Sequence, residues 1–237
     1  GQLLKLGVSG AGYQNGVWGI FANVIYRSYG PDEFEIIDDV LRLPKEKFED
    51  KDTDSAEGRM TSIEEVAPDL DLDAVIDAAT ENLASLAGGD PEPGSFTDDE
   101  LQAIEDHREF YGSAEWFERY STQQLIDDAT ADDRVAEVAY KGRKLIKASV
   151  RVDQADEIVA MQYTGDMFHR PGFDAIDRLN EAMVGRDITD DDGLLAAVEA
   201  VYEDDDVEIP WLPPEDFVQP LRRARSNLVP ADEFRRE

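Results

Sequence analysis

Two alternating segments joined by a short polar link constrain the fold of this chain more than any other feature. Residues 144–152, "KLIKASVRV", and residues 157–165, "EIVAMQYTG", alternate apolar and polar side chains as half-buried strands do. The link between them, "DQAD", is short and turn-forming, which predicts an antiparallel hairpin. Because helical patterns lie on both sides of this hairpin in the sequence, we expect the α+β fold class.

Six further segments have the apolar spacing of amphipathic helices. Thr97 is the expected N-cap of the third segment, where Glu100 completes a capping box, and Thr189 is the expected cap of the fifth. Gly185 is expected to close the fourth. The segments cover residues 30–44, 69–89, 96–111, 172–185, 189–203 and 213–226.

The beginning of the chain is expected to be extended over residues 3–8 and 16–27, with the glycine-rich "VSGAGYQNG" as a turn between two strands. A composition shift near residues 122–136 indicates a boundary. We therefore expect one domain over residues 1–122 and a second over residues 123–237.

Acidic residues dominate the composition, with 55 Asp and Glu against 23 Lys and Arg and a net charge of −32. Such a charge opposes a compact state through self-repulsion unless salt screens it, which points to a halophilic cytoplasm. An acidic surface for a basic partner is the alternative, and both interpretations disfavour binding to DNA or RNA. Because the chain has no run of 18 apolar residues and no signal-peptide pattern, we expect a soluble cytoplasmic protein without a membrane span.

Four basic residues gather near the start of the predicted hairpin, namely Lys141, Arg143, Lys144 and Lys147. A phosphate-binding or nucleic-acid-binding patch is one interpretation. Strand alternation places Lys144 and Lys147 on opposite faces, which weakens that interpretation. Charge balance against neighbouring carboxylates is the simpler expectation.

Motifs of established chemistries are absent from the sequence. The chain has no Cys and only two His, which excludes thiolate zinc sites and cysteine nucleophiles, and we expect no resident metal site. No Walker A, GxGxxG, HExxH, GxSxG or EF-hand pattern occurs. Residue patterns by themselves therefore indicate an acidic α+β protein and no particular reaction.

A family resemblance covers nearly the whole chain, and its most specific part begins at "KGRKLIKASVRV". Residues 141–185 resemble the accessory domain of lipoate–protein ligases, which has a Gly-Gly-Lys strand, a hairpin, a Gly-Asp-Phe-Phe turn and a helix that ends in Gly. Arg143 replaces the second Gly, and Met167 replaces the first Phe of the turn. The matching positions are Gly142, Lys144, Gly165, Asp166, Phe168 and Gly185.

The first half is similar to the C-terminal part of the family's catalytic domain. "SGAGYQNGVWGIFANVIY" resembles the strand region that begins with Lys-x-Ser-Gly, and "EGRMTSIEEVAP" looks like the Thr-Ser segment that follows it. "FTDDELQAIEDHREFYGSAEWFERYS" is similar to the closing helix with its Ser-x-Glu-Trp element. Because the family's Arg-Arg motif and glycine-rich stretch have no counterpart here, the resemblance implies a partial biotin/lipoate ligase-like catalytic domain followed by a small α+β accessory domain.

The resemblance also implies a set of site residues. The family's Lys-x-Ser-Gly lysine contacts the adenylate phosphate, and its position here is Gly7. Either a local shift makes Lys5 the catalytic cation, or this branch has lost or relocated the charge. Glycines in this strand would let the backbone approach the adenylate, and "VWGIFANVIY" would contribute walls to a tunnel for the acyl chain. The expected substrate-binding residues are Ser9, Gly10, Gly12 and Lys144.

The implied activity is ATP-dependent lipoate–protein ligation, with ATP, Mg²⁺ and lipoate as substrates or cofactors. Lipoate attacks the α-phosphate of ATP, and the acyl group then passes from the adenylate to a lysine of an acceptor. The implied acceptors are lipoyl domains of 2-oxoacid dehydrogenase complexes or the glycine-cleavage carrier protein, and we expect no nucleic-acid or membrane partner.

Two alternatives stay open. The first is a noncatalytic relative or accessory subunit that binds lipoyl domains, which the missing Arg-Arg segment and Gly7 favour for the chain by itself. The second is a lipoyl or octanoyl transferase that uses an acyl-carrier thioester in place of ATP. The lack of Cys argues against the related transferases that form a thiol-bound acyl intermediate.

Overall fold

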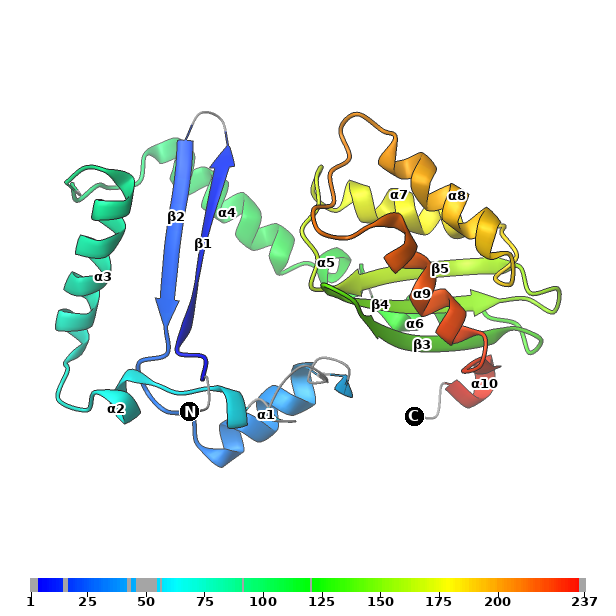
Figure 1. The fold of residues 1–237 in the computed structure, drawn as a ribbon, viewed down its shortest axis with the longest axis horizontal. Helices are drawn as coiled ribbons and strands as arrows, with labels where there is room; N and C mark the ends of the chain where they lie inside the picture. Colours follow the sequence, from blue (N-terminus) through cyan, green and yellow to red (C-terminus); the bar gives the residue numbers. More distant parts are fainter. Residues whose placement is uncertain are drawn as a thin grey trace. The chain divides into compact units, whose positions relative to one another are not determined.

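The structure is a computed structural model, and it describes residues 4–14, 17–41, 44–45, 55, 57–90, 92–119 and 121–234. Contacts divide the chain into two units, Gly1–Thr97 and Asp98–Glu237 (Figure 1). The fold is mixed α+β with antiparallel sheets, as the sequence predicts. The division by contacts falls earlier than the boundary expected between residues 122 and 123, which stays a prediction about the family's domains.

A four-stranded antiparallel sheet with the order β5-β4-β3-β6 organises the second unit. β4 pairs with β3 on one side and with β5 on the other, so the hairpin predicted over residues 144–165 is confirmed. The sequence patterns do not predict β3, although it supplies half of the pairing of β4. The strands are β3 (Arg134–Lys141), β4 (Leu145–Val152), β5 (Ile158–Gly165) and β6 (Val229–Pro230).

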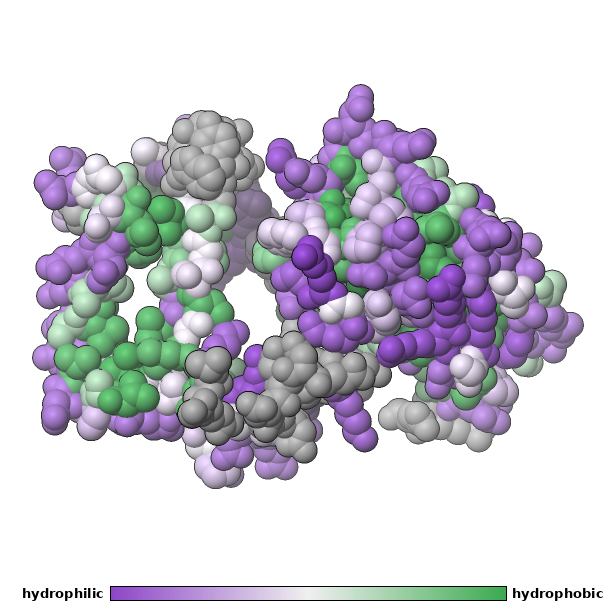
Figure 2. Space-filling model, in the orientation of Figure 1, coloured by the Kyte–Doolittle hydropathy of each residue, from purple (hydrophilic) through white to green (hydrophobic). Residues whose placement is uncertain are grey.

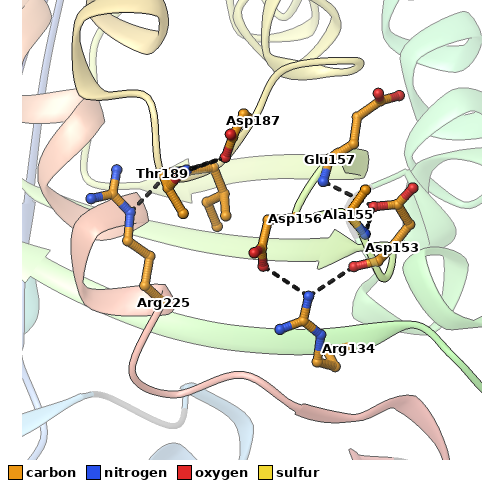
Figure 3. Close-up of polar contacts among 9 residues, drawn as sticks. Arg134, Asp153, Ala155, Asp156, Glu157, Asp187, Thr189 and Arg225 are labelled. Carbon is orange, nitrogen blue, oxygen red and sulfur yellow. Dashed lines mark hydrogen bonds and ion pairs between the residues drawn. The ribbon is translucent and has the colours of Figure 1, made fainter.

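Side chains as well as the backbone close the turn between β4 and β5 (Figure 3). Asp153 Oδ1 accepts hydrogen bonds from the backbone nitrogens of Ala155 at 2.8 Å and Glu157 at 2.9 Å. Arg134, on the neighbouring strand β3, donates from Nη2 to the Asp153 carbonyl and to Asp156 Oδ1, both at 2.8 Å. Asp156 has a φ of 66°, a left-handed conformation that Asp tolerates better than most residues. The acidic link therefore serves as the closing element of the hairpin.

Helices cover both faces of this sheet (Figure 1). α7 and α9 pack on one face, with α8 packed against both of them, while α6 and α10 pack on the other face. None of the helices in the described ranges combines the length and hydropathy that a bilayer-spanning helix needs. The helices are α6 (Thr122–Asp127), α7 (Asp174–Met183), α8 (Asp191–Tyr202), α9 (Pro214–Ala224) and α10 (Ala231–Phe234).

The alternation predicted for β4 is confirmed by its burial. Ile146 and Val150 are fully buried in the main core beneath α7 and α9. Lys147 and Arg151 take the intervening positions and point to the opposite face. Burying an aliphatic side chain of this size stabilises the fold by about 1.5–3 kcal/mol. A one-residue slip of β4 would turn Lys147 and Arg151 into the main core in place of these residues, so the register is strongly specified.

The second unit begins with two helices, α4 and α5. α4 (Asp98–Tyr111) begins directly after the expected cap Thr97. α5 (Ala114–Glu118) is capped by Ser113, whose Oγ accepts from the backbone nitrogen of Trp116 at 3.2 Å.

The expected cap of α8 is wrong by one residue. Asp190 is the N-cap, and its Oδ1 accepts from the backbone nitrogen of Gly193 at 3.0 Å. Thr189 instead donates its hydroxyl to Asp187 at 2.7 Å (Figure 3). A carboxylate and a hydroxyl are adjacent in the sequence, and the loop geometry decides which of them reaches the first turn. Gly185, expected to close α7, follows the end of that helix with a φ of 81°.

The first unit contains a two-stranded antiparallel sheet, β1 (Gly7–Gln14) and β2 (Val17–Val24), followed by short helices. The prediction that "VSGAGYQNG" forms a turn is wrong for its first residues, because Ser9, Gly10 and Gly12 lie inside β1. The long helix predicted over residues 69–89 is confirmed, with Gly88 in the left-handed conformation at its end. The helices are α1 (Pro31–Leu41), α2 (Ile63–Val66), α3 (Leu72–Ala87) and the 3₁₀ turn η2 (Glu57–Arg59).

Apolar side chains stay at the surface of the first unit. Figure 2 shows them over the two strands and α3. Among the described residues of this unit, the buried side chains are those of Thr61 and Ser62, and both are polar. Val40 is 74% exposed and Leu86 is 77% exposed. A two-stranded sheet is marginal by itself, and the part of this unit that the structure describes adds no buried apolar core to it.

A carboxylate joins the start of α8 to the end of α9 in the second unit. Asp191 accepts from Arg222 Nε at 2.9 Å and from Arg225 Nη2. The hydrogen bond from Arg225 is the main cause that lowers the pKa of Asp191.

We expect Asp191→Asn to lower the melting temperature at pH 7, because the variant loses this ion pair. A carboxyl group with a lowered folded pKa stabilises the fold above its unfolded pKa, about 3.9, and loses that contribution as the pH falls through the folded pKa. The difference in melting temperature between wild type and variant should therefore shrink below about pH 4. Thermal unfolding by circular dichroism from pH 7 to pH 3 measures it, with Asp205→Asn as an exposed control. A difference that stays constant over this range would contradict the assignment.

Candidate functional site

Two segments of the family resemblance meet at one end of the sheet in the second unit. Gly165 has a φ of 144°, and a Cβ at this position would lie 2.2 Å from the carbonyl oxygen of Leu145. The backbone nitrogen of Asp166 donates to the same carbonyl at 2.9 Å. Only glycine fits such a close backbone approach, and through it the chain leaving β5 crosses the end of the β3–β4 hairpin.

Gly142 lies at the tip of that hairpin, where a side chain would meet the side chains of two neighbouring residues. A Cβ there would lie 2.8 Å from Asp216 Oδ2 in the first turn of α9 and 3.0 Å from Tyr140 Cε1. The Gly142 nitrogen donates to the carbonyl of Lys144 at 3.1 Å, which closes the loop. Burial beside the hairpin raises the pKa of Asp216. Gly165 is therefore required by the backbone, whereas Gly142 leaves room for the side chains of Asp216 and Tyr140.

Lys144 lies against two exposed aromatic rings. Its Nζ is 4.8 Å from the ring centroid of Phe168 and 5.8 Å from that of Trp211. The two rings meet edge to face, with centroids 5.8 Å apart. Phe168 is 59% exposed and Trp211 is 57% exposed. A cation over an aromatic face at an exposed site contributes about 0.5–1 kcal/mol, so the contact orients the lysine without removing it from solvent.

The loops that carry the two rings are fastened to each other. Arg170 N donates to the Glu208 carbonyl at 2.9 Å, and Glu208 N donates back to the Arg170 carbonyl at 3.0 Å. Trp211 has a φ of 66°, which is unusual for a bulky residue. The next residue, Leu212, is buried, and its carbonyl accepts from the Tyr202 hydroxyl at 2.8 Å. The surroundings therefore hold Trp211 outward in a strained conformation.

Sequence reasoning did not single out Trp211 as a site residue. Its signal is the local pattern "IPWLPP", in which a Trp lies between prolines in a connecting segment. Prolines restrict such a segment to few conformations, so a large side chain there can be held in place without being buried.

The four basic residues of the hairpin form no ion pair with any residue that the structure describes. No direct ion pair therefore supports the expectation that they balance neighbouring carboxylates, and charge balance over longer distances stays a prediction. Arg178 of α7 shows the contrast, because it reaches Asp204 at 3.2 Å and Asp206 at 2.8 Å. Lys144 and Arg143 are thus available to a negative charge from outside the chain.

Lys5, the expected catalytic cation, lies just before β1 in the first unit. Its backbone nitrogen donates to the Arg59 carbonyl at 2.6 Å, and its carbonyl accepts from Thr61 N at 3.1 Å. The side chain is exposed and forms no ion pair within the described residues. The strand region and the Thr-Ser segment of the resemblance therefore lie side by side, and Lys5 is held where they meet.

The neighbouring strand positions 7 and 10 have little room for a side chain. A Cβ at Gly7 would lie 2.1 Å from the carbonyl oxygen of Asn23, so no larger side chain fits there without a shift. A Cβ at Gly10 would lie 2.6 Å from the Phe21 ring, which occupies the space a side chain would take. Packing of Phe21 within the two-stranded sheet is thus enough to account for glycine at position 10. A contact between Gly10 and an adenylate stays a prediction.

Ser9 and Gly12, the other expected substrate-binding residues of β1, pair across the ribbon with Ala22 and Gly19. Ser9 is exposed. Lys144 belongs to the second unit and contacts Phe168 and Trp211 as described above.

A hydroxyl and carboxylate network supports the Thr-Ser segment. Thr61 Oγ1 donates to Glu65 Oε2 at 2.7 Å, and Ser28 Oγ donates to Glu65 Oε1 at 2.9 Å. These two bonds lower the pKa of Glu65. The Ser62 and Ser28 hydroxyl oxygens are 2.7 Å apart. All of these groups have partners inside the unit, so the network positions the segment that fixes the backbone of Lys5.

The described residues do not form a resident metal site. No group of three or more His, Asp or Glu side chains gathers at metal-binding distance among them. The Mg²⁺ that the resemblance implies would arrive with ATP and be held mainly by phosphate and water oxygens, which needs no such group. The expected tunnel walls are open as well, because Ile20 is 39%, Phe21 58% and Val24 39% exposed. The part of the first unit that the structure describes presents a cation and an apolar ribbon without enclosing an acyl chain.

The chain is similar in part to solved structures. No protein-family model matches the chain, and no curated protein matches it. A chain from the structure of an archaeal lipoylation system, described as a bi-partite lipoate protein ligase and its E2 lipoyl domain from Thermoplasma acidophilum, is 27% identical. The match covers 38% of this chain and 97% of that chain, with a TM-score of 0.34. A score of this size does not establish a shared fold.

The close approach at Gly165 gives a direct test of how the site is built. We expect Gly165→Ala to destabilise the second unit by at least about 1–3 kcal/mol, because the new Cβ meets the Leu145 carbonyl and the backbone conformation disfavours a side chain. Gly94→Ala is the matched control, since a Cβ there meets nothing within 4 Å. Urea unfolding followed by tryptophan fluorescence measures both variants, and equal stability of the two would contradict the close approach.

Proposed function

We propose that this chain acts in protein lipoylation as a lipoate–protein ligase, activating lipoate with ATP and transferring it to a lysine of a lipoyl acceptor domain. The observation that carries the proposal is the meeting of the two accessory-domain motifs. The close backbone approach at Gly165 lies beside the place where Lys144 of the first motif lies on Phe168 of the second. Motif residues that are distant in sequence and meet at an exposed corner support a shared role.

The chemistry assigns different work to the two lysines. The α-phosphate of ATP gains negative charge as the lipoate carboxylate attacks, and a nearby cation stabilises that charge. Lys5 supplies this cation in the proposal, with Ser9 and the backbone at Gly10 and Gly12 alongside it. Lys144 serves in the proposal as a contact for the acceptor. ATP, lipoate and Mg²⁺ are the small molecules that the resemblance implies, and no step is assigned to Mg²⁺.

The exposed apolar surface of the first unit supports the interpretation as part of a catalytic domain. Strands in the middle of a larger sheet bury their apolar side chains against other layers. Phe21 is 58% exposed and Ile36 is 62% exposed here. An active catalytic domain would need additional polypeptide over this surface to enclose the acyl chain. A halophilic cytoplasm, the location that the net charge of −32 favours, completes the proposal.

The full-length protein should label an apo lipoyl domain of a 2-oxoacid dehydrogenase in a reaction that requires both ATP and lipoate. Intact-mass spectrometry of the acceptor measures the gain of one lipoyl group, in buffers of low and high salt. Reactions without ATP, and with the acceptor lysine changed to Arg, are the controls.

Two outcomes of that assay would contradict the ligase. An acceptor that stays unlabelled under all conditions supports the noncatalytic alternative, in which the chain binds lipoyl domains or assists another subunit. Labelling from an octanoyl-carrier thioester without ATP supports the transferase alternative.

We expect Lys144→Ala to lower kcat/KM for the acceptor about tenfold, which corresponds to about 1.4 kcal/mol. The melting temperature should fall only slightly, because Lys144 is partly exposed, forms no ion pair in the described part of the chain and loses only its contact with the two rings. Lys147→Ala is the matched control, since this lysine lies three residues further on, inside β4, at a position that points away from the main core. Unchanged turnover of Lys144→Ala would show that Lys144 is an ordinary charged surface residue with no role in the reaction.

A further inference from the structure

We infer that the corner formed by Lys144, Phe168 and Trp211, with Arg143 beside it, is a docking surface for an acidic face of the acceptor protein. We call this set the aromatic–basic corner. The inference depends on the proposed function for the identity of the partner as a lipoyl domain. The chemistry of the surface itself, two exposed rings and two cations, stands on the geometry of the second unit.

The exposure of the two rings is the first argument. Phe168 and Trp211 are more than half exposed and contact each other edge to face at 84°. Large aromatic side chains carry much of the energy of protein interfaces when a partner covers them. Their packing within the unit does not explain their presence, because the main core lies beneath α7 and α9 and neither ring belongs to it.

The preorganisation of the corner is the second argument. The paired backbone bonds of Arg170 and Glu208 join the two loops, and buried Leu212 anchors the segment that turns Trp211 outward. A surface whose side chains are already ordered loses less entropy when a partner binds. The left-handed backbone conformation of Trp211 is unfavourable for a bulky residue. The rest of the fold holds the residue in this conformation and keeps its ring exposed.

Charge complementarity selects the partner. This chain has a net charge of −32, so most of its surface repels an acidic partner protein. Arg143 and Lys144 form no ion pair with the residues that the structure describes. Lys144 lies over the exposed rings, and Arg143 is the exposed residue next to it in the chain. An acidic face can therefore dock favourably at this corner and unfavourably elsewhere, which gives one preferred orientation.

The geometry favours a protein over a nucleic acid. Bases bind exposed aromatic side chains by stacking on a free flat face. Here the rings stand edge to face, and the ammonium of Lys144 lies over both of them. A polyanion would also meet the strong negative charge of the surrounding chain.

Binding of an apo lipoyl domain with a negative net charge, labelled with a fluorophore, tests the inference in the absence of ATP and lipoate. We expect Phe168→Ala, Trp211→Asn and Lys144→Gln in the full-length protein each to raise the Kd at least fivefold in fluorescence anisotropy. Asn is chosen at position 211 because it tolerates a positive φ. Lys147→Gln is the matched control and should leave the Kd unchanged, since it removes an equal charge from a position inside β4 that points away from the main core.

The partner's side of the interface is tested with a second probe. The same lipoyl domain with its surface carboxylates changed to amides should bind the wild-type protein at least fivefold more weakly. Absence of binding, equal affinities for wild type and the three corner variants, or equal affinities for the two probes would overturn the inference. A single-stranded oligonucleotide that binds wild type and loses affinity in the same three variants would overturn it in favour of a nucleic-acid surface.

The outcomes separate this inference from the proposed function. Binding that depends on the corner, together with an acceptor that is never labelled, would leave the docking surface standing and remove the ligase activity. Labelling by variants of the corner with an unchanged KM for the acceptor would support the ligase and overturn the docking surface.

Discussion

The close backbone approach between Gly165 and Leu145 is the constraint on which the site in the second unit depends. Leaving β5, the chain has to cross the end of the β3–β4 hairpin, and the Leu145 carbonyl leaves no room for a Cβ there. The hydrogen bond from Asp166 to that carbonyl then fixes the direction of the following turn. Phe168 reaches Lys144 because of this crossing, so two glycine-containing motifs that look separate in the sequence form one structural element.

The two units differ in how much apolar surface they bury and in how their charged side chains are paired. In the second unit, a four-stranded sheet between helices buries a continuous apolar core, and arginines such as Arg178 and Arg225 pair with carboxylates at the surface. In the first unit, the described residues bury only polar side chains and leave the apolar ribbon exposed. The hairpin cations do not follow the pairing seen elsewhere in the second unit, and this departure marks the aromatic–basic corner.

Much of the local structure was predictable because it depends on neighbouring residues. The alternation of residues 144–152 and 157–165 determines the hairpin, and the helix over residues 69–89 ends at Gly88 because only glycine enters the left-handed conformation easily. The predictions failed where two local signals competed. Asp190 took the cap position expected for Thr189, and glycines that favour turns were placed inside β1, where Phe21 packs on Gly10.

The sequence by itself determined the α+β class, the hairpin, most helices and the presence of Lys5, Ser9, Gly10, Gly12 and Lys144 in family-like segments. These features follow from periodicity and from residue types at short spacing. Only the tertiary structure decided what those residues touch. The placement of Trp211 beside Lys144 depends on the β3–β4 hairpin, the turn after β5 and the loop before α9. No short-range sequence pattern predicts such a contact, because the contact arises from the packing of three segments that are distant in the sequence.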